Sequence, residues 1–325
     1  MTPVDVVLIG RNEGQRLIAC LESVQGQARQ VVYVDSGSTD NSISEAEARG
    51  AKVVNLDMSI PFTAARARNA GFDALDNPEF VQFIDGDCAL VPGYIDKARA
   101  HLEANPQVGM VTGWRSEIFP DASPYNQICD WEWHRPAGEI LACGGDMMVR
   151  ASLWRDVGGM NAQVIAAEDD EICCRFRKAG WTLQRIPHDM TRHDAAMLRF
   201  GQWWSRAVRT GHGFAQVGHL QPGYFSKERM RVILFALWLP LIAITSIASG
   251  LFSPMAFWVL VPVVGAYAFS YWRGLQGLIR DQQPKEMAPR MALLLSLSKF
   301  PNLIGMLRFH MRRLSGRDMR IIEYK

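Results

Sequence analysis

The sequence predicts an α/β protein with a doubly wound, mostly parallel sheet, followed by a C-terminal helical region that associates with a membrane. Through about residue 220, short apolar runs rich in Val and Ile alternate with helix-like stretches, the pattern of parallel strands covered by helices on both faces. Beyond about residue 230 the chain carries two long, uncharged apolar stretches. For a chain of 325 residues we expect two domains, over residues 1–225 and 226–325.

The expected elements of the first domain alternate regularly along the chain. Strands are predicted over residues 4–9, 31–34, 52–54, 80–84 and 182–186, the last followed by a turn at Pro187-His188-Asp189. Helices are predicted over residues 12–24, 44–49 and 62–75. In sheets of this kind, ligands bind in the crevice beyond the carboxyl ends of the strands. The polar residues that follow each strand are therefore the candidates for a binding site.

The two apolar stretches, residues 232–249 and 254–272, predict a transmembrane hairpin. Each is uncharged and about as long as a roughly 30 Å hydrocarbon core requires. Basic residues flank the pair on both outer sides, at 227–231 and 273–280. By the positive-inside rule both flanks face the cytoplasm, and the tip of the hairpin faces outward. A pair of buried helices in a soluble protein is the alternative.

A third C-terminal segment, residues 291–314, mixes apolar and basic positions. Leu303, Met306 and Leu307 alternate with basic residues such as Arg308 and Arg312. This pattern suits an amphipathic helix that lies on an anionic membrane surface. It suits equally a helix that packs against the N-terminal domain.

Composition excludes several other functions. The formal net charge of +2 and the scattered Lys and Arg residues give no reason to expect a nucleic-acid partner. The six cysteines form no Cys-x-x-Cys pair, so neither a zinc site nor a disulfide framework is indicated. Reduced thiols fit a cytoplasmic domain. The first residues lack the basic region and apolar core of a signal peptide. The sequence leaves the oligomeric state open.

The main candidate site is Asp85-Gly86-Asp87, at the end of the strand over residues 80–84. Two carboxylates this close repel each other unless a cation or a proton lies between them. Carboxylate oxygens suit Mg²⁺ or Mn²⁺, which also bind substrate phosphates. An ordinary turn is the alternative, because Asp and Gly are frequent in turns. The strand-end rule places further polar residues at the same crevice: Arg11, Asn12, Glu13, Asp35 and Ser36.

Several motifs, taken in order, resemble the family 2 glycosyltransferases of the GT-A fold. They are Asn-Glu at 12–13, Val-Asp-Ser-Gly-Ser-Thr-Asp at 34–40, Ala-Arg-Asn-Ala-Gly at 67–71, Asp-Gly-Asp at 85–87, Gly-Gly-Met-Asn at 158–161, Glu-Asp-Asp-Glu at 168–171 and the stretch 175–180. The resemblance covers about residues 4–190. It implies that this domain holds a nucleotide sugar, neutralises the leaving diphosphate and deprotonates an acceptor hydroxyl.

The resemblance implies a nucleotide site at the ends of the first two strands. Asp35 and Ser36 take the position that contacts the base or ribose, although many members have two acids there. Ile9 and Arg11 would flank the base, and Glu13 would complete this set; a solvated loop is the alternative for Arg11. Two cations of the next helix remain candidates for the diphosphate. Arg68 matches the family motif, whereas Arg66 suits an exposed helix face.

The resemblance also implies the residues that hold the metal and carry the reaction. Asp87 is the expected direct ligand of a divalent Mg²⁺ or Mn²⁺ ion, and Asp85 would reach the ribose or the metal. His193 would complete the metal site, with His188 as its competitor. Asp169 matches the catalytic base and has Asp170 as its rival. The acidic run could instead mark a helix start, which the helix dipole favours.

The acceptor side is less defined by the sequence. Gly145 and Asp146 follow an apolar run and would bring backbone close to the donor sugar or the acceptor. Trp131 and Trp133 offer a wall on which a sugar could stack, and core packing is the alternative for both.

Together these features predict a metal-dependent, inverting glycosyltransferase. Its nucleotide-sugar donor would be a UDP-sugar, and its acceptor a membrane-bound saccharide linked to polyprenyl diphosphate, in exopolysaccharide or cell-envelope glycan synthesis. The enzyme would lie at the inner membrane with its catalytic domain facing the cytoplasm. A sugar nucleotidylyltransferase is one alternative, but it needs a Gly-rich basic loop that residues 9–13 do not supply. A non-catalytic, membrane-tethered nucleotide-sugar sensor is the other.

Overall fold

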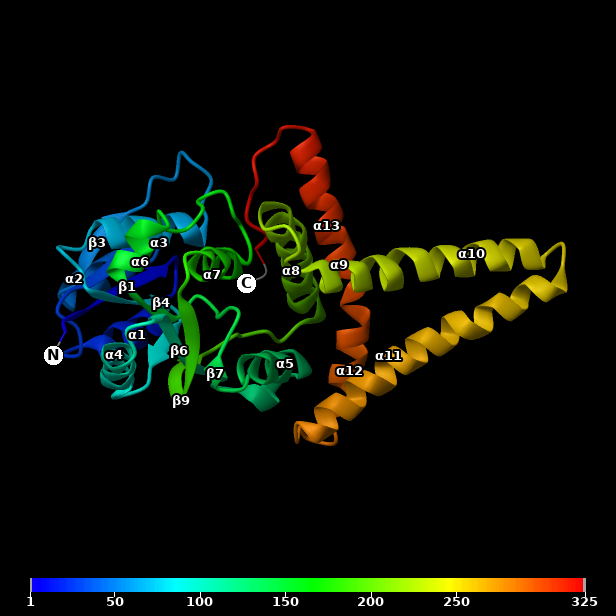
Figure 1. Ribbon diagram of the computed structural model, residues 1–325, viewed down its shortest axis with the longest axis horizontal. Helices are drawn as coiled ribbons and strands as arrows, with labels where there is room; N and C mark the ends of the chain where they lie inside the picture. Colours follow the sequence, from blue (N-terminus) through cyan, green and yellow to red (C-terminus); the bar gives the residue numbers. More distant parts are fainter. Residues whose placement is uncertain (1, 324–325) are drawn as a thin grey trace. The chain divides into compact units, whose positions relative to one another are not determined.

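The computed structural model describes residues 2–323 and divides them into two compact units (Figure 1). The sheet unit comprises residues 2–119, 132–195 and 319–321, and the helical unit comprises the rest. The division therefore falls near residue 195 rather than at the expected residue 225. The helix after residue 199 belongs with the C-terminal helices.

The sheet unit is built on one mixed sheet. Its strands are β1 (Val4–Gly10), β2 (Val31–Asp35), β3 (Lys52–Asn55), β4 (Phe80–Asp85), β5 (Cys88–Leu90), β6 (Val108–Glu117), β7 (Gly138–Glu139), β8 (Met147–Arg150) and β9 (Thr182–His193). Their order is β3-β2-β1-β4-β8-β6-β9-β5, with β7 paired to β9. The strands from β3 to β4 are parallel, whereas β8 runs antiparallel to both of its neighbours. The sheet is therefore mixed: β6 and β9 are also parallel to each other, whereas β8, β5 and β7 run antiparallel to their partners.

Helices cover both faces of this sheet, as expected for a doubly wound domain. They are α1 (Gln15–Val24), α2 (Ser42–Ala48), α3 (Ala64–Asp73), α4 (Tyr94–Ala104), α6 (Ala151–Asp156) and α7 (Glu168–Lys178). One apolar core joins Leu17 of α1 and Tyr94 of α4, and the other joins Trp154 of α6 and Phe176 of α7. The ring of Trp154 stacks on Phe83 of β4, with centroids 4.4 Å apart.

Strand β9 differs from the prediction because it runs through the expected turn at 187–189 to His193. Thr112 of β6 pairs with Arg185, but Trp114 pairs with Asp189, so β9 bulges between the two pairs. The bulge brings backbone close to Gly113, where a Cβ would lie 2.5 Å from the carbonyl oxygen of His188. A β-bulge re-aims the rest of its strand, and here it carries β9 on to His193.

The helical unit contains α8 (Phe200–Leu220), α9 (Ser226–Ile233), α10 (Leu239–Gly250), α11 (Leu260–Arg280), α12 (Ala288–Leu297), α13 (Lys299–Leu314) and most of α5 (Pro124–Trp133). A π-helical turn joins α9 to α10, next to Pro240, whose missing N–H explains the irregular turn. The helices Ser226–Gly250 and Pro254–Arg280 are long and apolar enough to cross a membrane. Only 17% and 6% of the most apolar stretch of each helix is buried. Core helices of a soluble protein are mostly buried, so the structure does not support that alternative.

The segment over residues 291–314 forms parts of two helices, not the single interfacial helix that we expected. The helix is interrupted at Ser298, which lies between α12 and α13. One face of α13 is buried, with Met306 and Phe309 inside, while Met311 and Leu314 on the same helix are exposed. The buried face agrees with the packing interpretation, and the interfacial interpretation stays a prediction for the exposed face.

Candidate active site

The Asp85-Gly86-Asp87 turn connects β4 to β5 at the carboxyl edge of the sheet. The N–H of Gly86 donates to the carbonyl oxygen of Ile9 at 2.8 Å. A Cβ at Gly86 would lie 3.0 Å from that same oxygen, so a residue without a side chain suits this position. The close approach to β1 fixes where both aspartates point.

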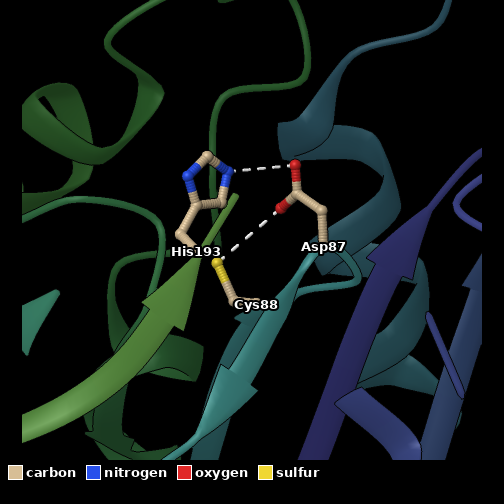
Figure 2. A group of neighbouring side chains, drawn as sticks. All are labelled: Asp87, Cys88 and His193. Atoms are coloured by element: carbon tan, nitrogen blue, oxygen red, sulfur yellow. Dashed lines mark hydrogen bonds and ion pairs between the residues drawn. The ribbon is translucent and has the colours of Figure 1, made fainter. Parts of the chain in front are cut away.

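Asp87 lies beside His193 (Figure 2), because Cys88 of β5 pairs with His193 of β9. The distance between Asp87 Oδ2 and His193 Nε2 is 3.0 Å, and both side chains are about nine-tenths buried. His188, the competing histidine, lies instead 3.3 Å from Lys97 Nζ. The structure thus brings Asp87 and His193 together and leaves His188 elsewhere on β9.

The donor set around Asp87 fits a divalent ion. Asp87, Cys88 and His193 each present one ligand atom, all within 4.8 Å of one another. His193 Nδ1 is buried and has no hydrogen-bond partner among residues 2–323. Burial raises the pKa of the Cys88 thiol, so this group stays protonated and is a poor ligand for a hard cation. The Asp87 carboxylate then remains as the type of ligand that Mg²⁺ and Mn²⁺ favour, with the imidazole of His193 beside it.

Asp85 faces two arginines. Its Oδ1 accepts from Arg68 Nη2 at 2.6 Å, and its Oδ2 accepts from Arg115 Nη2 at 3.2 Å. Burial raises the pKa of Asp85, but the Arg68 and Arg115 guanidinium groups outweigh it and hold that pKa below its usual range. Asp85 is therefore an ionised carboxylate whose two oxygens both have partners. Asp87 alone of the pair faces His193.

Arg68 of α3 joins the Asp85 side of the site to α7. It is buried, and its Nη1 donates to Glu168 Oε1 at 3.0 Å. A Cβ on Gly145 would lie only 2.0 Å from Arg68 Nη2 and 3.2 Å from Asp85 Oδ1. The backbone of Gly145 therefore lies against Arg68 and Asp85, and its approach to a sugar stays a prediction. Arg66, by contrast, donates to backbone carbonyls of the loop that precedes α3.

The side chain of Asp146 points into the protein, so its carboxylate is not offered to an acceptor, and the expected approach of the backbone at this position stays a prediction. Asp146 is 1% exposed and accepts from Arg115 Nε at 3.0 Å and from Thr191 Oγ1 at 2.8 Å. Its other oxygen accepts the backbone N–H of Asp85 at 3.0 Å. Arg115 was missed in the sequence. One signal was available: Arg115 lies near the carboxyl end of β6, and the ends of strands were also the reason for selecting Asp85 and Asp87.

Asp169 lies in the first turn of α7, after a strained residue. Ala167 precedes the helix with φ at 57°, a left-handed conformation that alanine rarely adopts and that is common near functional sites. Burial, and then the charges of Asp170 and Glu168, raise the pKa of Asp169 well above its usual range. A Cβ on Gly144 would lie 4.0 Å from Asp169 Oδ2. Asp169 and Asp85 therefore both lie close to the Gly144-Gly145 segment.

The acidic residues at the start of α7 differ in the partners that they contact. Glu168 pairs with Arg68, and Glu171 pairs with Arg175 at 2.7 Å. Arg175 also donates to the carbonyl oxygen of Gly159 at 2.6 Å. These two acids stabilise the fold around the site. Glu168 and Glu171 therefore have structural partners, and the catalytic role of Asp169 stays a prediction.

The loops after β1 and β2 are tied together at the predicted nucleotide end. Asn12 Oδ1 accepts the N–H of Thr39 at 2.7 Å. Asp35 is buried, and its carboxylate accepts the N–H groups of Gly37 and Ser38 at 2.9 and 2.8 Å. The hydroxyl of Ser36 is buried and has no hydrogen-bond partner in the part of the chain that the structure describes. The Asp35 carboxylate therefore stabilises the turn that follows it, while the Ser36 hydroxyl is available to bind a ligand.

The other members of the nucleotide set and the two tryptophans lie as follows. Arg11 is exposed, Ile9 is almost buried, and Glu13 pairs with Arg16 at 2.8 Å. Trp133 packs edge-on against His193, with ring centroids 4.9 Å apart. Trp131 belongs to the helical unit, where its indole N–H donates to Asp281 Oδ2 at 3.0 Å. Of the two tryptophans, Trp133 is the one that lies next to His193.

Comparisons with known proteins agree with this geometry. The sequence model of the family described as Glycosyl transferase family 2 matches residues 5–143. A pre-mycofactocin glycosyltransferase of Mycobacterium tuberculosis is 25% identical over 67% of this chain and 48% of its own length. A TPR repeat-containing protein of Synechococcus elongatus is 28% identical over 43% of this chain and 36% of its own length. The chain thus spans half or less of the curated relatives that it matches.

Solved structures share the fold at low sequence identity. A mannosyltransferase of Pyrobaculum calidifontis, in complex with GDP-Man and Mn²⁺, has a TM-score of 0.59 and 17% identity, covering 94% of this chain and 88% of that one. TarS 1–349 of S. aureus, in complex with UDP-GlcNAc, has a TM-score of 0.51 and 13% identity, covering 98% and 93%. These likenesses show the GT-A fold. The family match over residues 5–143 supports a family 2 glycosyltransferase in the N-terminal part of the chain.

Proposed function

We propose that this protein transfers a sugar, with inversion, from a nucleotide-sugar donor to a lipid-linked saccharide at a membrane. One observation carries the proposal: a carboxylate–histidine pair, a buried arginine–aspartate pair and a carboxyl group of raised pKa gather at one edge of the sheet. Glycosyl transfer needs these three parts to neutralise the leaving diphosphate, hold the donor and deprotonate the acceptor.

The donor is proposed to be a UDP-sugar, bound at the ends of β1 and β2. The structural relatives named above were solved with GDP-Man or UDP-GlcNAc, which supports a nucleotide sugar as the class. Ser36 offers a buried, unpartnered hydroxyl, and Ile9 offers an apolar surface beside it in the sheet. Arg11 is exposed where a base would enter.

Asp87 and His193 would hold a Mg²⁺ or Mn²⁺ ion. When bound, such an ion stabilises the charge that builds on the leaving diphosphate. Asp85 and Arg68 lie next to this pair as a fixed ion pair, so they keep the positions of the surrounding groups. Arg115, held by Asp146, fixes Asp85 from the other side.

Asp169 is the proposed base. Its carboxylate removes the proton of the acceptor hydroxyl while that oxygen bonds to the anomeric carbon. The bond from this carbon to the donor phosphate oxygen breaks, and its electron pair leaves with the nucleoside diphosphate. Attack opposite to the leaving group inverts the anomeric carbon. The raised pKa of Asp169 makes its carboxylate a stronger base than that of an ordinary aspartate.

The acceptor is proposed to be a saccharide linked to polyprenyl diphosphate, used in exopolysaccharide or cell-envelope glycan synthesis. Two exposed apolar helices, Ser226–Gly250 and Pro254–Arg280, support a place in the inner membrane. Basic residues flank both, which favours a catalytic domain on the cytoplasmic side.

Donor binding tests this proposal. The purified full chain is incubated with a panel of nucleotide sugars, with and without Mn²⁺, and its thermal unfolding is followed. We expect one UDP-sugar to raise the unfolding midpoint with Mn²⁺ and D87N to lose most of that increase. Absence of any shift across the panel would show that the donor site is wrongly assigned.

A second measurement separates the enzyme from its alternatives. We expect D169N to keep the donor-dependent thermal shift and to lose transfer to a lipid-linked acceptor, and NMR to show an inverted anomeric configuration in the wild-type product. A sensor would show no transfer in the wild type either. A nucleotidylyltransferase would form a nucleotide sugar from sugar phosphate and nucleoside triphosphate.

A further inference from the structure

A group of cationic side chains gathers in the helical unit, outside the residues of the candidate active site. Arg229 comes from α9, His219 from the last turn of α8, and His310 and Arg313 from α13. We call these four residues the cationic cluster. Helices α8 and α9 follow one another in the chain, whereas α13 is distant in sequence and is brought to them by the fold.

Contacts between the helices bring the cluster together. The guanidinium of Arg229 lies against α8, because a Cβ on Gly218 would meet Arg229 Cζ at 2.8 Å. His219 follows Gly218, and the centroid of its ring lies 6.0 Å from that of Phe309. The ring centroids of Phe309 and His310 are 5.1 Å apart. Phe309 is buried, so its contacts hold the two histidines in place.

The cluster lacks a counter-charge among the described residues. Within residues 2–323, none of its four members forms an ion pair with a carboxylate. Arg229 Nε is buried and has no hydrogen-bond partner. Burial, and then the charges of Arg313, His219 and Arg229, lower the pKa of His310, which shows that these groups repel one another. An anion at this place would remove the repulsion and satisfy the buried nitrogen.

The surroundings of the cluster are apolar and exposed. Met230 follows Arg229 and is 65% exposed, and Met311 and Leu314 on α13 are 60% and 87% exposed. Arg229 itself lies near the start of the first apolar helix, Ser226–Gly250. If a small soluble anion bound here, these exposed apolar side chains would remain in contact with water. A ligand with an anionic head and apolar chains would use both features.

We propose that the cationic cluster binds the phosphate headgroup of an anionic membrane lipid. The guanidinium groups of Arg229 and Arg313 would contact the phosphate oxygens, because arginine matches phosphate with paired N–H donors. The lipid chains would lie along the exposed apolar residues. This inference rests on the proposed membrane association and adds to it a specific lipid site.

The test compares lipid binding to two matched variants of the full chain in a neutral detergent. R229Q/R313Q removes two charges from the cluster, and K285Q/R290Q removes two exposed charges elsewhere in the helical unit. Native mass spectrometry measures binding of phosphatidylglycerol and of phosphatidylcholine to each. Each basic group near a membrane surface contributes about a fivefold affinity, so we expect R229Q/R313Q to bind phosphatidylglycerol roughly 25-fold more weakly. K285Q/R290Q should bind like the wild type.

Three outcomes would overturn the lipid site. R229Q/R313Q could keep the wild-type preference for phosphatidylglycerol, or K285Q/R290Q could lose it equally, which would indicate general surface charge. Alternatively, millimolar inorganic phosphate could displace the lipid completely, which would assign the cluster to a free phosphate. Failure of membrane association itself gives a different result, since the wild type would then bind neither lipid.

Discussion

At the scale of single residues, Arg68 joins the two halves of the candidate site. It is 2% exposed and lies between Asp85 and Glu168, so its charge is compensated on both sides. Removing one partner of a buried ion pair leaves an uncompensated charge and is strongly destabilising. The position of Arg68 therefore fixes Asp85, next to Asp87, and Glu168, next to Asp169. A small displacement of this one guanidinium would disturb both the proposed metal side and the proposed base.

Gly145→Ala tests this role. The added Cβ would lie 2.0 Å from Arg68 Nη2, which cannot move freely because both of its carboxylate partners are in place. We expect kcat/KM for sugar transfer to fall by about 10²-fold, the typical effect of a 1 Å misplacement in a site.

The matched control is Gly144→Ala, whose Cβ would meet nothing closer than Asp169 Oδ2 at 4.0 Å. It should retain transfer within a few-fold of the wild type. Equal activity of the two variants would show that Arg68 does not need its present position.

Asp169 gives a prediction for pH. Burial, and then Asp170 and Glu168, raise its pKa, so its ionised fraction grows at a higher pH than for an ordinary aspartate. We expect kcat/KM to rise with pH as Asp169 loses its proton. Asp170→Asn removes one of the charges that raise this pKa, so the rising limb should move to lower pH. The pH profiles of both enzymes measure the shift, and an unmoved limb would assign the limb to another group.

Single residues also show what the sequence could predict of the site. The strand-end rule located Asp85 and Asp87, since both follow a clear apolar strand. It could not tell that Asp146 points inward, because that depends on the pairing of β8 with β4 and β6. Arg115 became a partner of Asp85 through the same pairing. Contacts between strands distant in sequence decide such orientations, and no local pattern records them.

At the scale of elements, the packing of α13 on α8 explains why a basic, amphipathic segment is partly buried. A Cβ on Gly305 would meet the carbonyl oxygen of Val208 at 2.0 Å, and one on Gly211 would meet that of Asn302 at 2.0 Å. The two helices thus approach backbone to backbone at their glycines. Periodicity showed that one face of this segment is apolar, but it could not show whether that face meets lipid or protein.

Gly305→Ala is expected to separate these helices. Backbone atoms surround the position, so the added methyl can be accommodated only by moving a helix, and such overpacking typically costs about 1–3 kcal/mol. The midpoint of thermal unfolding of the full chain in detergent should fall. Gly201→Ala, on α8 with no atom near its Cβ, is the control and should leave the midpoint unchanged or slightly raised. If both variants had the same midpoint of thermal unfolding as the wild type, the prediction would be wrong.

At the scale of the whole molecule, the residues of the proposed chemistry all belong to the sheet unit, while both candidate spans belong to the helical unit. Alternating strands and helices were readable from the sequence because each has its own period. The uncharged stretches were readable because length and composition define a span. The antiparallel half of the sheet and the division near residue 195 were not, since both depend on contacts formed only in the folded chain.

The exposed apolar helices lead to a prediction that separates lipid from water as their surroundings. Ile244 and Val264 are each 64% exposed. If these helices span a bilayer, an arginine at the middle of a span costs about 2.5–3.5 kcal/mol, so I244R/V264R should move the protein out of the alkaline-carbonate-resistant membrane fraction. If the helices face water, the same substitutions should be neutral. I60R/L141R is the charge-matched control, because Ile60 and Leu141 are 51% and 65% exposed and lie outside both helices. Loss of membrane retention in I244R/V264R alone would support the hairpin, and retention by all three proteins would contradict it.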